Sequence, residues 1–289
     1  MKLHKVPVQS SSRSVSLTIS LVSAFFALQT PYAANAASCE GNPNALGTSR
    51  TIAVDPKALT AVGKMMYPDT LPLEDHEVVL TFDDGPLPKR TNVVLDELAH
   101  ECVKATFFII GRMAKEFPEL VQRVHAEGHT IGNHTQNHLL KLRRLPLDDV
   151  KKEIDEGAAS TAAAAGSPDF VAPFLRLPGL RFSPEIEDYA KEKGLMIWSS
   201  DAVADDWRRI SSKRVLALAL ERLEQHGRGI LLLHDIQKRT AGALPQLLDE
   251  LKRRHYKVVH VVAADSQNPK TAAAPKSATD PLPAATPKE

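Results

Sequence analysis

The chain has 289 residues, which is long enough for one large domain or two small ones. Its composition, 43% hydrophobic and 25% charged, is that of a globular protein with a sizeable core. The formal net charge of +1 lacks the basic excess of a nucleic-acid-binding protein, so we expect no nucleic-acid partner.

The first 36 residues have the features of a secretory signal peptide. Lys2, Lys5 and Arg13 precede a moderately apolar run over residues 15–28, and Ala34-Asn35-Ala36 follows as a small-residue cleavage pattern. The apolar run is shorter than the ~20 residues that cross a bilayer, which disfavours a retained anchor. We therefore expect cleavage near Ala36, no stable membrane span afterwards, and export to the periplasm or the extracellular space.

Two segments flank the predicted domain. Residues 37–75 form an N-terminal arm that contains Cys39, one of only two cysteines. Cys39 and Cys102 either pair as a disulfide or stay as free thiols, and both interpretations remain open. Residues 266–289 are rich in Ala, Pro, Lys and Thr without apolar periodicity, which predicts a disordered tail.

Residues 76–265 alternate short apolar runs with amphipathic stretches. The runs are too uniformly apolar for half-exposed strands, which predicts a parallel sheet covered on both faces. The predicted strands are Val78–Phe82, Ala105–Ile110, His129–Gly132, Val171–Arg176, Leu195–Ser199, Gly229–Leu233 and Tyr256–Val262. The predicted helical segments are Lys89–Glu101, the apolar face from Met113 to Val124, Leu147–Ala165, Pro184–Glu192, Ser211–Gln225 and Leu244–Leu251. We expect an α/β fold, a distorted (β/α) barrel of about seven parallel strands with its chemistry at the strands' carboxyl ends.

Two adjacent carboxylates, Asp83 and Asp84, follow the first predicted strand in the segment Thr81–Pro86. A plain Asp-Gly turn would explain one acid, but two adjacent carboxylates repel each other. A metal ion beside them would relieve this repulsion, with one acid holding the ion and the other moving a proton. The pair therefore indicates either a strand-ending turn or half of a metal-dependent site.

Two histidines four residues apart, His134 and His138, have the spacing that places both imidazoles on one face of a helical turn. With Asp84 they make a set of two histidines and one carboxylate, which zinc takes in catalytic sites. Non-haem iron oxygenases use the same set, and two surface histidines are the simpler alternative. The extra acid beside Asp84 favours hydrolysis, because a hydrolytic site needs a base there.

Three further polar clusters end later strands. Arg176 is followed by a Pro-Gly loop, which suits an arginine that orients a carboxylate. Asp201 follows an apolar run, which suits an acid that pairs with a histidine. Trp207, six residues later, suits an exposed ring against which a sugar packs. His234 directly follows the sixth predicted strand, at a position that suits a general acid. The alternatives are a solvated arginine, a core tryptophan with two solvated acids, and a buried structural histidine.

Together these clusters resemble the polysaccharide deacetylase family, the carbohydrate esterases that share the nodulation-type chitooligosaccharide deacetylase domain. The resemblance covers roughly residues 76 to 265. It is carried by TFDDGP at 81–86 and HTQNH at 134–138, with KATFFIIGR at 104–112 similar to the family's second strand.

The resemblance implies roles for the residues of the first two motifs. Asp83 is expected to be the base that takes a proton from the attacking water, and Arg176 to orient it. Asp84, His134 and His138 are expected to hold a divalent metal, usually zinc in this family.

It also implies roles for the later clusters. The backbone N–H of Gly179 is expected to help bind the oxyanion, and His234 to protonate the departing amine. Asp201 is expected to tune His234, and Trp207 to pack beside the groove that binds the substrate. Two departures from the family pattern concern these residues: Gly179-Leu180 replaces an aromatic residue and a glycine, and Asp206-Trp207 lies further from Asp201 than usual.

The sequence therefore predicts a metal-dependent hydrolase that removes N-acetyl groups from N-acetylglucosamine-containing glycans such as chitooligosaccharides, peptidoglycan or exopolysaccharides. The expected partner is an acetylated carbohydrate. Two alternatives remain: a non-catalytic sugar-binding module of the same fold, and a related hydrolase of cyclic amides or ureides.

Overall fold

The computed structural model describes residues 39 and 41–264, so the predicted signal peptide (1–36) and tail (266–289) lie outside the described residues. Within the described part, ten strands form one sheet, in which all paired strands run parallel. The strands are β1 (Thr48–Val54), β2 (Ala61–Val62), β3 (Glu77–Asp83), β4 (Thr106–Ile109), β5 (Thr130–Asn133), β6 (Phe174–Leu175), β7 (Met196–Trp198), β8 (Ala202–Val203), β9 (Gly229–His234) and β10 (Lys257–Ala263).

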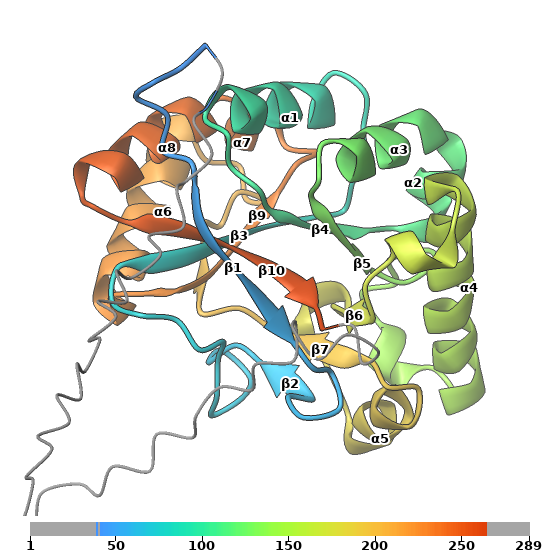
Figure 1. Ribbon diagram of the computed structural model, residues 1–289. Coiled ribbons are helices and arrows are strands. Elements are labelled where there is room, and N and C mark those ends of the chain that lie inside the picture. Colours follow the sequence, from blue (N-terminus) through green and yellow to red (C-terminus); the bar gives the residue numbers. More distant parts are fainter. Residues whose placement is uncertain (1–38, 40, 265–289) are drawn as a thin grey trace, which may run out of the picture. The chain divides into compact units, whose positions relative to one another are not determined.

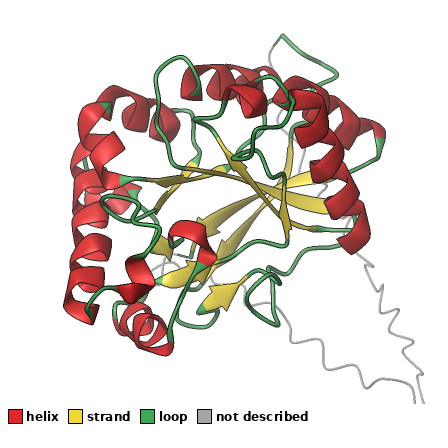
Figure 2. Ribbon diagram, turned by 180° about the vertical axis from the view of Figure 1, so that it is seen from behind, coloured by secondary structure: helices red, strands yellow, loops and turns green. Residues whose placement is uncertain are grey.

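The sheet curls into a distorted barrel, and β3 is its central strand. This strand pairs with β9 on one side, with β4 at its carboxyl end on the other, and with the start of β10 at its own start. The sheet continues from β4 through β5, β6 and β7 to β2, from β9 to β8, and from β10 to β1. Figures 1 and 2 show the strands at the centre with helices around them. The expected α/β barrel is confirmed, and each of the seven predicted strands is present.

The helices are α1 (Thr91–His100), α2 (Gly111–Glu116), α3 (Pro118–Ala126), α4 (Leu147–Ala165), α5 (Pro184–Glu192), α6 (Ser212–His226), α7 (Lys238–Ala241) and α8 (Leu244–Arg253), with 3-10 turns η1 (Leu142–Arg144), η2 (Pro168–Phe170) and η3 (Pro178–Leu180). The helices α4 and α5 have the predicted bounds. The predicted apolar face from Met113 to Val124 belongs to two helices, because the helical conformation is interrupted at Phe117 and a new helix, α3, begins at Pro118. Proline suits this first helical position, where no N–H is needed. Within the described residues, no helix is long and apolar enough to cross a membrane.

Apolar side chains cover both faces of the central strands. Every residue of β3 is buried, as its run of Val, Leu and Phe predicts. On the outside, its side chains pack with those of α1, α6 and α8 in one cluster. Inside the barrel, the ring of Trp198 lies 5.6 Å from that of Phe108 and 5.0 Å from that of Phe174. Trp198 is therefore a core residue.

The predicted N-terminal arm is part of the sheet. β1 pairs with β10 and β2 pairs with β7, although both strands precede residue 76. β1 has alternating exposure because it lies at an edge, so it lacks the uniform apolar run that marks the other strands. Cys39 and Cys102 form a disulfide, which settles the question that the sequence left open. The folded part thus begins well before the predicted boundary at residue 76.

Candidate active site

The two adjacent carboxylates lie at the carboxyl end of β3. Asp83 is the last residue of the strand and is buried, whereas Asp84 leaves the strand with a left-handed φ of 77°. The next residue must be small, because a Cβ on Gly85 would lie 2.2 Å from Oδ2 of the buried Asp235. The turn therefore separates the two carboxylates and gives them different neighbours.

The segment from His134 to His138 is a loop at the end of β5, and the helical turn expected from the spacing is wrong. Thr135 and His138 are left-handed, with φ of 65° and 55°, which a helix does not allow. Contacts with α4 hold this backbone: Glu153 accepts hydrogen bonds from the Asn137 N–H at 2.8 Å and from its side-chain amide at 2.6 Å. The two imidazoles meet because α4 positions the loop.

Asp84, His134 and His138 form a cluster whose ligand atoms all lie within 4.8 Å of one another. Oδ1 of Asp84 is 3.1 Å from Nε2 of His138 and 3.4 Å from Nε2 of His134. This oxygen is buried and accepts no hydrogen bond from any described residue. Since a buried carboxylate oxygen requires a partner, the three side chains fit a divalent cation held by two nitrogens and one oxygen.

The protonation of the cluster suits a metal site. Nδ1 of His134 lies 2.6 Å from the carbonyl oxygen of Arg176, which only accepts, so Nδ1 carries the proton and Nε2 presents a lone pair. Burial, followed by the neighbouring His134, lowers the pKa of His138. Burial opposes ionisation of Asp84, but the imidazoles of His134, His234 and His138 hold the pKa of Asp84 well below its usual range. The cluster thus combines a carboxylate with imidazoles.

Asp83 is held by Arg176, the residue that follows β6. Nη1 of the fully buried Arg176 donates to Oδ1 of Asp83 at 2.7 Å and to Oγ1 of Thr81 at 2.8 Å, while Nη2 donates to the Ser199 carbonyl at 2.9 Å. Burial lowers the pKa of Arg176, and Asp83 opposes this effect. The other oxygen of Asp83 lies 3.8 Å from Nε2 of His134. Arg176 therefore fixes Asp83 with one oxygen beside the cluster.

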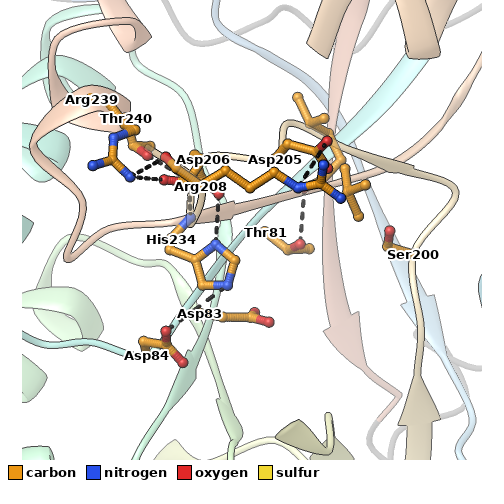
Figure 3. A network of polar contacts seen from close by, with 12 residues as sticks. Thr81, Asp83, Asp84, Ser200, Asp205, Asp206, Arg208, His234, Arg239 and Thr240 are labelled. Atoms are coloured by element: carbon orange, nitrogen blue, oxygen red, sulfur yellow. Dashed lines mark hydrogen bonds and ion pairs between the residues drawn. The ribbon is translucent and has the colours of Figure 1, made fainter. Parts of the chain in front are cut away.

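His234, the last residue of β9, lies between two carboxylates (Figure 3). Its Nε2 is 3.9 Å from Oδ2 of Asp84, and its Nδ1 is 2.7 Å from Oδ1 of Asp206. Oδ2 of Asp206 accepts the His234 backbone N–H at 2.7 Å. Burial favours the neutral imidazole, but Asp206, Asp84 and Asp83 raise the pKa of His234 to about 9. His234 is therefore suited to donate a proton at neutral pH.

The predicted partner of His234 is wrong, because Asp201 lies at the opposite end of β9. Its carboxylate accepts hydrogen bonds from the backbone N–H of Ile230 at 2.7 Å, from Oγ1 of Thr70 at 2.6 Å and from the N–H of Lys64 at 2.8 Å. Ile230 and His234 are four residues apart on an extended strand, or about 13 Å. Asp201 therefore fixes the loop that precedes β3 and takes no part in the cluster.

The two predicted substrate-binding residues line one groove beside the site. Trp207 is 46% exposed, and its ring lies edge-on to the His234 ring with centroids 5.8 Å apart. Gly179 lies in η3 with a left-handed φ of 67°, and within the described part of the chain its N–H donates no hydrogen bond. Trp207 and Gly179 share the lining of a cavity of about 460 Å³. Both thus border the space next to His234.

Sequence reasoning missed the residues that hold His234. Asp206 is completely buried, and its carboxylate also accepts from Oγ1 of Thr240, while its carbonyl accepts from Nη1 of Arg239 at 2.8 Å. The signal was the pair Asp205-Asp206 directly before Trp207. The two acids differ in role, because Arg222 binds both oxygens of Asp205 at 2.9 and 3.1 Å.

The fold and the site together define a class of protein. Parallel strands of a barrel bring two histidines, two carboxylates and a further histidine, which is paired with Asp206, to their carboxyl ends. Such sets occur in metal-dependent hydrolases.

Comparison with known proteins identifies the family. The model of the polysaccharide deacetylase family matches residues 71–198. A peptidoglycan-N-acetylglucosamine deacetylase of Bacillus cereus is 32% identical over 196 residues, which cover 66% of this chain and 89% of the relative. A chitooligosaccharide deacetylase of Rhizobium leguminosarum bv. trifolii is 34% identical over 164 residues, covering 56% and 73%. The chain belongs to the polysaccharide deacetylase family.

A solved structure agrees with this assignment. The peptidoglycan deacetylase of Bdellovibrio bacteriovorus superposes with a TM-score of 0.69 at 33% identity, covering 78% of this chain and 62% of that chain. The chain spans 54%, 66% and 38% of the length of the first three curated relatives that it matches.

Proposed function

We propose that this protein is a metal-dependent hydrolase that removes N-acetyl groups from N-acetylglucosamine-containing glycans. The observation that carries the proposal is the division of labour between adjacent acids: Arg176 holds Asp83 at 2.7 Å, and Asp84 joins the histidine cluster. A metal-dependent hydrolase needs one carboxylate that binds the metal and a separate carboxylate that acts as a base. A module that only binds metal or sugar needs no oriented second carboxylate.

Asp84, His134 and His138 are the residues that would hold the metal, and their donor set of two imidazoles and one carboxylate suits zinc. A bound zinc ion supplies a Lewis acid that polarises the acetamide carbonyl and makes water more acidic. The unpartnered oxygen of Asp84 supports this assignment.

The protein's own groups supply the proton transfers. Asp83 is placed to accept the proton of the attacking water, because Arg176 occupies one oxygen and leaves the other facing the cluster. His234, charged and held by Asp206, is placed to donate a proton to the sugar nitrogen as acetate leaves. The free N–H of Gly179 is available to the oxyanion. Trp207 offers a ring face to the sugar.

We further propose that the protein works outside the cytoplasm, in the periplasm or the extracellular space. The basic, apolar and small-residue order of residues 1–36 supports export. The Cys39–Cys102 disulfide also supports it, because disulfides persist in oxidising compartments.

Acetate release from N-acetylglucosamine oligomers and from peptidoglycan, with and without a chelator, tests the proposal. We expect release that the chelator stops and that added zinc restores. Asp83→Asn should keep zinc affinity and lose about 10²- to 10⁴-fold in rate, as expected when a positioned base is removed. Full activity of this variant would contradict the role of Asp83. Oligomer binding without acetate release would favour a sugar-binding module, and turnover of cyclic ureides alone would favour the other alternative.

A further inference from the structure

Five of the connections at the carboxyl ends of the strands present exposed cations and no exposed carboxylate. In the connections that follow β3, β5, β6, β8 and β9, there is no glutamate, and every aspartate is buried or half-buried. The exposed charged residues of these connections are Lys89, Lys141, Arg143, Arg144, Arg181, Arg208 and Arg209. These connections therefore carry a net positive charge at their exposed positions, although the whole chain has a formal net charge of only +1.

Four of these cations gather in the groove that Trp207 and Gly179 line. Leu140 and Trp207, 68% and 46% exposed, supply its apolar surface. Among the described residues, no carboxylate lies within 4.0 Å of the four charged groups, whereas seven of the other thirteen described arginines form ion pairs. The four cations are Lys141, Arg143, Arg144 and Arg181. The positive charges of these four side chains are not neutralised by nearby carboxylates, so they suit an anionic ligand.

The groove opens directly from the site. Trp207 contacts both, since its ring centroid is 5.8 Å from that of His234. Gly179 follows Arg176 by three residues, and a Cβ there would meet nothing closer than the Arg181 side chain at 3.9 Å. The absence of a side chain at Gly179 leaves the space between the site and Arg181 free. A substituent on a sugar bound at the site can therefore reach the cations.

We propose that this groove, which we call the cationic groove, binds a carboxylate group carried by the glycan next to the acetamido sugar that is hydrolysed. This assignment rests on the proposed function and adds specificity to it: the substrate is an anionic glycan and not a neutral oligomer. Arginine suits the role because its planar guanidinium donates two parallel hydrogen bonds to a carboxylate. Trp207 and Leu140 pack on the faces of the sugars that lie between the catalytic cluster and the cations of the groove.

Initial rates on two substrates of matched length test the cationic groove: peptidoglycan strands, which carry carboxylates, and neutral N-acetylglucosamine oligomers. We expect Arg143→Ser/Arg144→Ser to lower kcat/KM on the strands by about 5- to 30-fold, through loss of two exposed charge contacts. On neutral oligomers the change should stay within about twofold. Raising the salt from about 0.1 to 1 M shortens the screening length from about 10 to about 3 Å and should reduce the preference of the unaltered protein.

Lys191→Ser/Arg228→Ser is the matched control. It also removes two exposed positive charges, but these residues precede β7 and β9 and so lie at the other end of the strands. It should change neither rate. An equal loss on both substrates, or no loss on the strands, would overturn the assignment.

Strands freed of peptide by an amidase identify the source of the carboxylate. The amidase frees the lactyl carboxylate, which peptide-bearing strands hold as an amide. A preference that rises after this treatment assigns the bound carboxylate to the lactyl group, and one that disappears assigns it to the peptide. Equilibrium binding of the same strands to Asp83→Asn, with and without the Arg143 and Arg144 changes, gives a readout without turnover. Binding that depends on these arginines, together with no acetate release by the unaltered protein supplied with zinc, would refute the proposed function and keep the cationic groove.

Discussion

Gly157 of α4 lies against the backbone of Thr135 in the loop between the two histidines. A Cβ on Gly157 would be 2.5 Å from the Thr135 carbonyl carbon and 2.6 Å from Oδ1 of Asn133. Glycine inside a helix costs about 1 kcal/mol relative to alanine, so its presence here needs a reason. The reason is contact: only an unsubstituted Cα lets α4 approach the loop that carries His134 and His138.

Gly157→Ala should therefore displace this loop and weaken metal binding. We expect zinc affinity to fall by about 10- to 100-fold, which is typical when a group that supports metal ligands is disturbed. Titration calorimetry on the metal-free protein measures this. Ala159→Gly, on an exposed position of the same helix, is the control and should lower helix stability without affecting zinc affinity. Unchanged affinity in Gly157→Ala would contradict the proposed contact.

Asp206 and Asp201 should behave differently when each is changed to asparagine. Asp206→Asn removes the negative charge beside Nδ1 of His234, so we expect kcat to fall by about 10²- to 10⁴-fold. Asp201 accepts the backbone N–H groups of Ile230 and Lys64 on its two oxygens, so Asp201→Asn leaves one of these buried donors unpaired. This should lower the free energy of unfolding by about 1–3 kcal/mol and change the activity little. Acetate release and urea unfolding separate the two. The reverse pattern would restore Asp201 as the partner of His234.

The disulfide should stabilise the folded state by restricting the unfolded chain. Cys39 and Cys102 close a loop with a sequence separation of 63, for which chain entropy predicts about 4 kcal/mol. Cys39→Ser/Cys102→Ser should therefore unfold at lower urea concentration while acetate release at 25 °C persists, since both positions lie outside the catalytic cluster. A reductant should produce the same shift in the unaltered protein and none in the variant. Equal stability of the two proteins would show that the bridge contributes nothing.

Acid should destabilise the fold through His260. Burial, then His129 and Lys104, lowers the pKa of His260 to about 4, whereas an unfolded histidine titrates near about 6.5. Between these values the unfolded chain binds a proton that the folded chain does not, so this contribution to stability is complete above about 6.5 and declines towards about 4. The loss amounts to about 3 kcal/mol.

Urea unfolding at several pH values measures this loss. The Thr130 hydroxyl donates to the Val261 carbonyl at 2.6 Å, so Nε2 of His260 donates to that hydroxyl at 2.9 Å. His260→Gln keeps a donor without a titrating group and should flatten the decline. An unaltered pH dependence in His260→Gln would assign the acid sensitivity to other groups.

Particular residues show what the sequence could and could not predict. The strands ending in Asp83 and His234 were predicted because continuous apolar runs mark them, and the parallel arrangement then brought their ends together. Asp206 was missed because β8 has only two residues, too few for any periodicity. The acid that follows the predicted strand Leu195–Ser199, Asp201, was therefore chosen instead. The loop of His134 was misjudged because its shape depends on Glu153 and Gly157, which lie about twenty residues further along the chain.

The pairing of β1 with β10 has a consequence for synthesis. Ser49 donates to the Val258 carbonyl, and 209 positions separate the two residues. The first strand of the described part is thus completed by the last one there, so its edge stays unsatisfied until nearly the whole polypeptide has emerged. Such distant pairing slows folding and leaves an open template for wrong partners in the meantime. A nascent chain stalled before residue 257 should therefore need a chaperone to stay soluble.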